Sequence, residues 1–186
     1  MVSQQAICVL FFIVDCLSLT WASLSIPKIM STNTTDCAAL SLILPGKVWF
    51  PGSAEYTAEK VSYFAAFENE ISPTCFVQPS NVDEVVKVVD HLRCSPLAGH
   101  TKVAIRSGGH TAWAGSANCP DGITIDLSKL KTVNIDPKTK IASIGVGNQW
   151  VDVYSKLGEQ GLAIVGGRVG KVGVGGLVLG GKLVTI

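Results

Sequence analysis

Charge of one sign, histidine, aromatic residues and long apolar runs are all scarce in this sequence. Lys and Arg number 15 and Asp and Glu 14, so the formal net charge is +1, without the basic excess of a nucleic-acid-binding protein. Only three histidines are present, His91, His100 and His110, and they lack the close spacing of a metal site, so we predict no metal. Apolar residues still make up 47% of the 186 residues, which excludes wholesale disorder and predicts one packed domain.

An unbroken apolar run covers residues 6–14, which is too short to cross a bilayer that requires about 20 residues. Small and polar residues follow it as far as Ser23. The pattern predicts a secretory signal peptide over residues 1–23, with cleavage near Ala22 or Ser23. We therefore expect a secreted protein without a membrane anchor after cleavage, whose mature chain starts with a flexible segment over residues 24–35.

Four cysteines remain after the predicted cleavage: Cys37, Cys75, Cys94 and Cys119. No pair has CxxC spacing, which disfavours a zinc site. In a secreted protein we expect these cysteines to be oxidised, and four of them allow three pairings. Asn33 begins an Asn-Thr-Thr sequon, which predicts N-glycosylation at an exposed position.

The middle of the chain has the pattern of a βαβ unit. Strands are predicted over residues 74–77 and 102–105, and Ser80 is placed to cap a helix between them. One face of that helix carries a row of aliphatic side chains: Val82, Val85, Val86, Val89 and Leu92. We expect a sheet to cover this face, and the length of the unit favours a parallel strand pair with a right-handed crossover.

Further elements surround this unit. Helices are predicted from Asp36 to Leu44 and from Asn148 to Gln160, each beginning at a capping residue. Strands are predicted over residues 123–127, 132–135, 141–145 and 163–165, the second and third forming a hairpin. Six aromatic residues are expected to pack in the core and at interfaces: Trp49, Phe50, Tyr56, Tyr63, Phe64 and Phe67. The predicted fold class is α+β, with a βαβ piece and additional mixed strands.

Two adjacent glycines follow the predicted strand over residues 102–105, in the segment Arg106-Ser107-Gly108-Gly109-His110. Glycine freedom lets several backbone N–H groups turn toward one point, which suits an anion. Arg106 and Ser107 are residue types found around phosphates, and His110 could act as a nucleophile, a base or a metal ligand. Alone, so short a motif is more often a tight turn beside a solvated or buried histidine.

A second glycine-rich segment lies at the end of the chain, where nine of the 19 glycines fall within residues 161–181. Residues 176–182 spell GxxxxGK, but Leu183 occupies the place of the Ser or Thr that binds Mg²⁺ in a P-loop. A nucleotide hydrolase is therefore excluded. A dinucleotide-binding fingerprint is also disfavoured, because Val178 stands where its third glycine is required.

Four segments in order resemble one family: PSNVDEVVKVV, KVAIRSGGHTAWAGSANCPDGITIDLSKL, IASIGVGNQWVDVYSKL and GLAIVGGRVGKVGVGGLVLGG. They resemble FAD-linked oxidases with the p-cresol methylhydroxylase type of FAD-binding domain, in the berberine-bridge-enzyme-like branch and most closely its secreted fungal members. The resemblance covers residues 36–181. It implies an FAD-binding domain over residues 36–186 that is truncated at its C-terminus, with the substrate domain missing.

The resemblance implies roles for particular residues. The loop at residues 106–110 would hold the FAD pyrophosphate through backbone N–H groups, and the second glycine-rich loop would lie along the same cofactor. The implied cofactor-binding residues are Arg106, Ser107, Gly108, Gly109, His110, Gly173, Gly175 and Gly176. His110 would be bonded through a ring nitrogen to the flavin 8α-methyl carbon. Many relatives carry a second attachment cysteine where this chain has Val169, so we expect attachment through His110 alone.

The same resemblance implies a disulfide between Cys37 and Cys94, which leaves Cys75 and Cys119 to pair by exclusion. It also implies that the usual acid–base residues lie in the missing part, so no catalytic residue is assigned. The full-length activity would be that of a secreted oxidase, which removes a hydride from a small hydroxylated or amine-bearing substrate and passes the electrons to O₂. The alternative is a non-catalytic secreted domain with at most an affinity for flavin.

Overall fold

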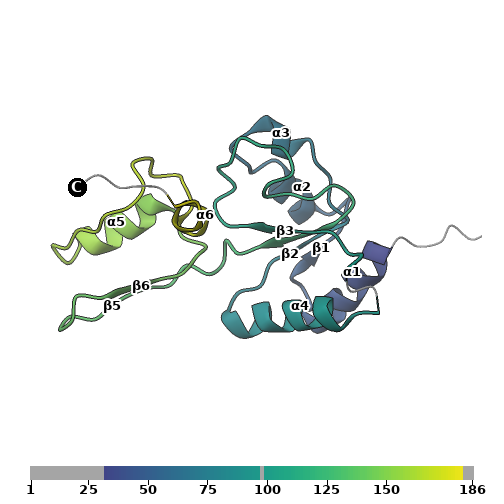
Figure 1. Cartoon of the computed structure of the whole chain (residues 1–186), viewed down its shortest axis with the longest axis horizontal. Helices are drawn as coiled ribbons and strands as arrows, with labels where there is room; N and C mark the ends of the chain where they lie inside the picture. The colour runs from purple at the N-terminus through teal and green to yellow at the C-terminus, as the bar shows by residue number, and fades with distance from the viewer. Residues whose placement is uncertain (1–31, 97–98, 182–186) are drawn as a thin grey trace, which may run out of the picture.

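The computed structural model of the chain describes residues 32–96 and 99–181, which form two lobes (Figure 1). The first lobe contains α1 (Thr32–Ile43), β1 (Val48–Trp49), α2 (Ala54–Lys60), α3 (Ala66–Asn69), β2 (Cys75–Val77), α4 (Val82–Cys94), β3 (Val103–Arg106) and β4 (Ile123–Asp126). The second lobe contains β5 (Val133–Ile135), β6 (Ala142–Ile144), α5 (Trp150–Gly158) and α6 (Val174–Leu179). This mixture of helices with parallel and antiparallel strands confirms the predicted fold class.

The sheet of the first lobe has the strand order β1-β2-β4-β3. β1 pairs antiparallel with β2, whereas β4 pairs parallel with both β2 and β3. The βαβ unit therefore contains parallel strands as predicted, but β4 lies between them, so β2 and β3 are not neighbours. All four residues of β4 are buried, because this strand is central and both of its faces are covered.

Helices cover both faces of this sheet: α1 and α4 lie on one side and α2 and α3 on the other (Figure 1). The core on the α1 side consists of Cys37, Leu40, Leu44, Val48, Cys75, Val77, Val88, Ile123 and Ile125. The core on the α2 side consists of Tyr56, Tyr63, Phe76 and Ala117. The aromatic prediction is only partly confirmed, because Phe64 and Phe67 are exposed at 66% and 63%.

Helix α4 buries a different face from the one predicted. Asn81 rather than Ser80 caps it, since the Asn81 side chain accepts a hydrogen bond from the N–H of Glu84 at 2.9 Å. Val88 is fully buried, while the predicted core residues Val82, Val86 and Val89 are among the exposed hydrophobic residues. The helix packs against α1, and its contacts with the core cluster come from Val88 and from Leu92, the last residue of the predicted row.

Helix α1 begins at Thr32, so residues 32–35 are helical rather than flexible. Asp36, which was expected to cap the helix, instead lies within it and is buried, accepting a hydrogen bond from Ser95 Oγ at 2.8 Å. Asn33 is only 8% exposed, and its side-chain amide donates to the carbonyl of Asp121, so the expected exposure of the sequon is wrong. Glycosylation stays a prediction, and the predicted signal peptide lies outside the described residues.

The disulfide joins Cys37 to Cys75, with their Cα atoms 6.1 Å apart, and Cys94 and Cys119 are free thiols. The predicted Cys37–Cys94 bond is therefore wrong, as is a bond between Cys75 and Cys119. Cys37 of α1 and Cys75 of β2 belong to the same buried cluster, whereas Cys94 is exposed at the end of α4. Packing of α1 directly on the sheet decides the pairing.

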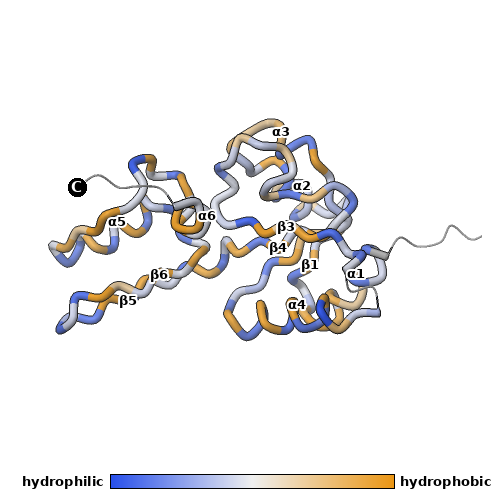
Figure 2. The backbone as a smooth tube through the Cα atoms, viewed as in Figure 1, coloured by the Kyte–Doolittle hydropathy of each residue, from blue (hydrophilic) through white to orange (hydrophobic). Residues whose placement is uncertain are grey.

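The second lobe is built on the predicted hairpin, in which β5 and β6 pair antiparallel. Its core consists of Trp150, Val153, Leu157 and Val174. Figure 2 shows hydrophobic residues on both strands and on α5. Residues 163–165 belong to no strand, so the last predicted strand is wrong.

Helix α5 begins at Trp150, with Gln149 at its N-cap position instead of the predicted Asn148. Asn148 is buried, and its side-chain amide donates to the carbonyls of Thr132 at 3.1 Å and Gly145 at 2.9 Å. It thereby fastens the hairpin to the start of the helix. Within residues 32–96 and 99–181, no helix combines the length and the apolar character needed to span a bilayer.

Candidate cofactor-binding site

The two glycine-rich segments meet where the lobes join. A Cβ atom added to Gly108, just after β3, would lie 2.5 Å from both the Cα and N atoms of Gly173, just before α6. Real Cβ atoms do not approach backbone so closely, so two glycines are required at this contact. The structure thus brings together two of the predicted cofactor-binding residues, which are far apart in the sequence.

Ser107 strengthens the junction between the lobes. Its hydroxyl donates a 2.6 Å hydrogen bond to the carbonyl of Val146 in the second lobe. A Cβ at Gly175 would lie 3.1 Å from Ser107 Oγ, so the N-terminal end of α6 packs against this hydroxyl. Ser107 uses its proton within the protein and therefore does not offer it to a phosphate.

The meeting segments present backbone N–H groups that have no protein acceptor. Among the described residues, no acceptor pairs with the N–H groups of Ser107, Gly108, Gly109 or His110. Gly109 adopts a left-handed φ of 59°. Consecutive amides that include a left-handed residue form a concavity suited to an anion. This arrangement fits the diphosphate of a dinucleotide.

The first turn of α6 adds donors beside this loop. The N–H groups of Gly175 and Gly176 also lack an acceptor in the described part of the chain, as is usual at the start of a helix. Gly176 has open space around its Cα, whereas Gly173 and Gly175 are packed against the loop after β3. The predicted glycines of both segments therefore lie in one place.

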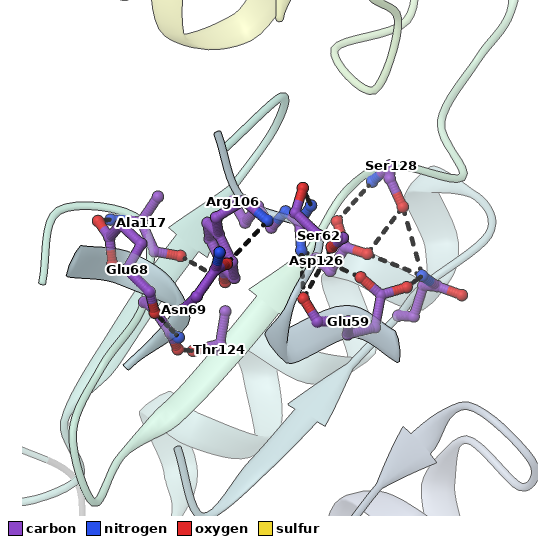
Figure 3. Close-up of polar contacts among 12 residues, drawn as sticks. Glu59, Ser62, Glu68, Asn69, Arg106, Ala117, Thr124, Asp126 and Ser128 are labelled. Carbon is purple, nitrogen blue, oxygen red and sulfur yellow. Dashed lines mark hydrogen bonds and ion pairs between the residues drawn. The ribbon is translucent and has the colours of Figure 1, made fainter. Parts of the chain in front are cut away.

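Arg106 is placed differently from the prediction. Its guanidinium forms a 3.1 Å ion pair with Glu59, donates to the carbonyl of Ser62 at 3.3 Å and lies 4.0 Å from the centre of the Tyr63 ring (Figure 3). The residue is only 7% exposed. Its side chain thus stabilises the interior beneath α2, and these contacts do not support its predicted role as a cation for phosphate.

A second carboxylate lies close to this ion pair (Figure 3). Asp126 is fully buried and accepts hydrogen bonds from Gln78 Nε2 and Ser128 Oγ, each at 2.7 Å. Gln78 Nε2 also donates to Glu59 at 3.0 Å and so bridges the two carboxylates. Burial first and the charge of Asp126 second raise the pKa of Glu59, although Arg106 acts in the opposite direction.

This raised pKa predicts a pH dependence of stability. Because folding raises the pKa of Glu59, its contribution to stability is fully present below the unfolded pKa and is lost as the pH rises through the folded pKa. The variant Glu59→Gln resembles the protonated form and should gain stability relative to the wild type as the pH increases. Urea unfolding of both proteins between about pH 4 and pH 8 measures this difference, and a constant difference would contradict it.

Glu68 holds the loop that follows His110 (Figure 3). Its buried carboxylate accepts backbone hydrogen bonds from Gly115 at 3.2 Å, Ser116 at 3.0 Å and Ala117 at 2.9 Å. This role was not predicted from the sequence. The carboxylate lies in α3, 47 to 49 positions before the residues it contacts, and no local pattern links them.

His110 is half-buried beside the unpaired amides. Its ring is stacked on that of Phe64, with the ring centres 4.0 Å apart and the planes inclined by 11°. Phe64 also donates its backbone N–H to the carbonyl of Gly109 at 3.1 Å. No group of three potential metal ligands occurs within the described ranges, so the histidine is not part of such a cluster there.

Residues 73–183 match the model of a family described as an FAD binding domain. The match covers more than half of the chain and includes both glycine-rich segments, so this chain belongs to that family. The FAD-dependent monooxygenase sdcF of Emericella nidulans is 38% identical over 146 residues, which cover 78% of this chain. The FAD-dependent monooxygenase drtC of Aspergillus calidoustus is 38% identical over 137 residues, or 74% of this chain.

Solved flavoenzymes share the fold. The BBE-like 1 protein of Physcomitrella patens is 26% identical, with a TM-score of 0.60 over 78% of this chain. The 6-hydroxy-D-nicotine oxidase of Arthrobacter nicotinovorans is also 26% identical, with a TM-score of 0.60 over 70% of this chain. Berberine bridge enzyme, at 21% identity and a TM-score of 0.67, shows the fold alone. The predicted berberine-bridge-enzyme-like FAD-binding fold is thereby confirmed.

The chain spans about 30% of the length of the curated relatives it matches: 30% of sdcF and 26% of drtC. It likewise covers 30% of the BBE-like 1 chain. The part that it does contain includes the donors that fit a dinucleotide. Backbone amides of residues 107–110 and of Gly175 and Gly176 would hold the phosphates, and His110 stands beside them.

Proposed function

We propose that this chain is the FAD-binding part of a secreted oxidoreductase that oxidises small hydroxylated or amine-bearing substrates with O₂ as the acceptor. The observation that carries the proposal is the backbone contact of Gly108 with Gly173, which gathers amides without acceptors from two segments. When bound, FAD supplies a ring system that accepts a hydride and returns its electrons to oxygen. The relatives' names, which include monooxygenases and an oxidase, support a reaction with dioxygen.

We propose further that His110 is the sole covalent attachment point for this cofactor. The imidazole follows directly after the loop amides that fit the diphosphate, and a histidine nitrogen is a nucleophile near neutral pH. Val169 carries no nucleophilic atom, which supports a single attachment at His110. The predicted signal sequence in residues 1–23 supports secretion.

The variant His110→Ala tests both the cofactor and its attachment. The purified wild-type chain should be yellow, and its colour should remain with the protein after acid precipitation. The variant should release all its flavin into the acid supernatant, because an alanine side chain forms no bond to the ring system. Absorption spectra of pellet and supernatant provide the measurement, and His100→Ala, at an exposed position, provides the matched control.

The alternative function is that of a secreted domain without catalysis. A colourless wild-type preparation that takes up no FAD after dialysis would favour this alternative. Flavin that dissociates from wild type and His110→Ala alike would leave FAD binding intact but contradict the covalent bond. Mass spectrometry of the tryptic peptide that contains His110 distinguishes these results, because attached flavin adds its own mass.

A further inference from the structure

The imidazole of His110 stacks on an aromatic ring, and its ring nitrogens form no hydrogen bond with the described residues. Phe64 covers one face at a ring-centre distance of 4.0 Å and an inclination of 11°. Neither ring nitrogen of His110 has a hydrogen-bond partner among the described residues. In many proteins a hydrogen bond to one ring nitrogen orients the histidine, and that nitrogen is then not available to form another bond. Here the orientation comes from stacking.

Phe64 is itself fastened to the histidine loop. Its N–H donates to the carbonyl of Gly109 at 3.1 Å, one residue before His110. Two residues earlier, the carbonyl of Ser62 accepts from Arg106 at 3.3 Å. Between them, the N–H of Tyr63 donates to the Asn69 side chain at 3.1 Å, and its hydroxyl donates to a backbone carbonyl. The two stacked rings therefore lie on segments that are joined by hydrogen bonds.

Phe64 contributes little to the hydrophobic core. Its side chain is 66% exposed, although large aromatic residues are usually buried for most of their surface. Phe67 is exposed to almost the same extent, at 63%, but stacks on no other ring in the described structure. The stacked ring of Phe64 is thus placed for a contact with His110 rather than for burial.

We propose that Phe64 is a positioning residue for the attachment of flavin to His110, an inference that rests on the proposed function. Attachment requires a ring nitrogen with a free lone pair directed at the 8α-methyl carbon. In that reaction a C–N bond forms while the N–H bond and one methyl C–H bond break. The two protons and two electrons pass to dioxygen, giving hydrogen peroxide. Stacking fixes the plane of the imidazole and leaves both nitrogens available.

The test compares binding with attachment in Phe64→Ala, Phe64→Tyr and wild type. The full 186-residue chain is produced without flavin and mixed with FAD in air. Binding is followed by quenching of flavin fluorescence, and attachment by the acid-stable flavin formed over time. Phe64→Ala should bind FAD with little change in Kd but attach it about tenfold more slowly, as expected when a reacting group loses its orientation. Phe64→Tyr keeps an aromatic face and should restore the rate.

Phe67→Ala is the matched control, since it removes an equally exposed phenylalanine three positions away. It should attach flavin at the wild-type rate. If Phe64→Ala aggregates, Phe64→Leu provides an apolar side chain without an aromatic face. Attachment at the wild-type rate in folded Phe64→Ala or Phe64→Leu would overturn the proposal, while wild-type protein that takes up no FAD would instead overturn the proposed function.

An independent readout does not involve flavin. The carbon-bound protons of the His110 imidazole should resonate upfield in the wild-type spectrum, because they lie over the Phe64 ring. Their resonances should move downfield in Phe64→Ala and stay unchanged in Phe67→Ala. Unchanged resonances in Phe64→Ala would show that the two rings do not stack in solution and would also overturn the proposal.

Discussion

Replacing Gly108 with alanine is expected to separate the two glycine-rich segments and to abolish flavin retention. The added Cβ would lie 2.5 Å from both the Cα and N atoms of Gly173, and neither backbone atom can move as a flexible side chain could. Overpacking of this kind costs about 3 kcal/mol of unfolding free energy when the surroundings are rigid. Urea unfolding would measure the loss, and acid-stable absorbance would measure the flavin.

The matched control is Gly158→Ala, at the end of α5. An added Cβ there has no atom within 4 Å, so this variant should keep or slightly increase stability and should retain flavin. Equal behaviour of the two variants would contradict the close contact between Gly108 and Gly173. The comparison separates a local clash from the general effect of replacing glycine.

The second large effect is expected from Arg106→Leu, which removes the cation from a buried cluster. The side chains of Arg106 and Glu59 are 8% and 22% exposed, and Asp126 beside them is fully buried. Leucine would leave two carboxylates together without a counter-charge, so we expect a loss of about 3 kcal/mol in unfolding free energy. The loss should appear in protein without any ligand, because it does not depend on phosphate binding.

A double-mutant cycle with Glu59→Gln identifies the origin of this effect. The second substitution removes one of the uncompensated carboxylates, so the double variant should recover part of the lost stability. Arg93→Leu is the control, since Arg93 forms an ion pair at 71% exposure and should change stability by less than about 0.5 kcal/mol. Strictly additive effects of Arg106→Leu and Glu59→Gln on the free energy of unfolding would argue against the pair as the cause.

Local patterns predicted the individual elements well and their arrangement less well. The hairpin of β5 and β6, the strand over residues 75–77 and the helix after it follow from hydrophobic spacing and turn residues. The position of β4 between β2 and β3 does not, because strand order depends on long-range packing. The same limit explains the disulfide: three pairings satisfy the sequence, and only the packing of α1 on β2 selects Cys37 and Cys75.

The candidate site was likewise predicted only in part. Glycine content indicated both segments, and the structure places Gly108 against Gly173 as a shared cofactor site requires. The ion-pair partner of Arg106 could not be predicted, because Glu59 lies 47 positions before it and no motif connects the two residues. The stacking of Phe64 on His110 was not predicted either, because the two residues are far apart in the sequence and no sequence pattern links them.

The junction of the lobes has a consequence for the whole chain. Residues 127–132 connect the lobes covalently, and the contacts of Gly108 with Gly173 and of Ser107 with Val146 close the junction without a covalent bond. A dinucleotide that accepts hydrogen bonds from the amides of both lobes would link the two lobes. Its binding free energy would add to the cohesion of the lobes, by about 2.7 kcal/mol when its concentration is about 100 times Kd.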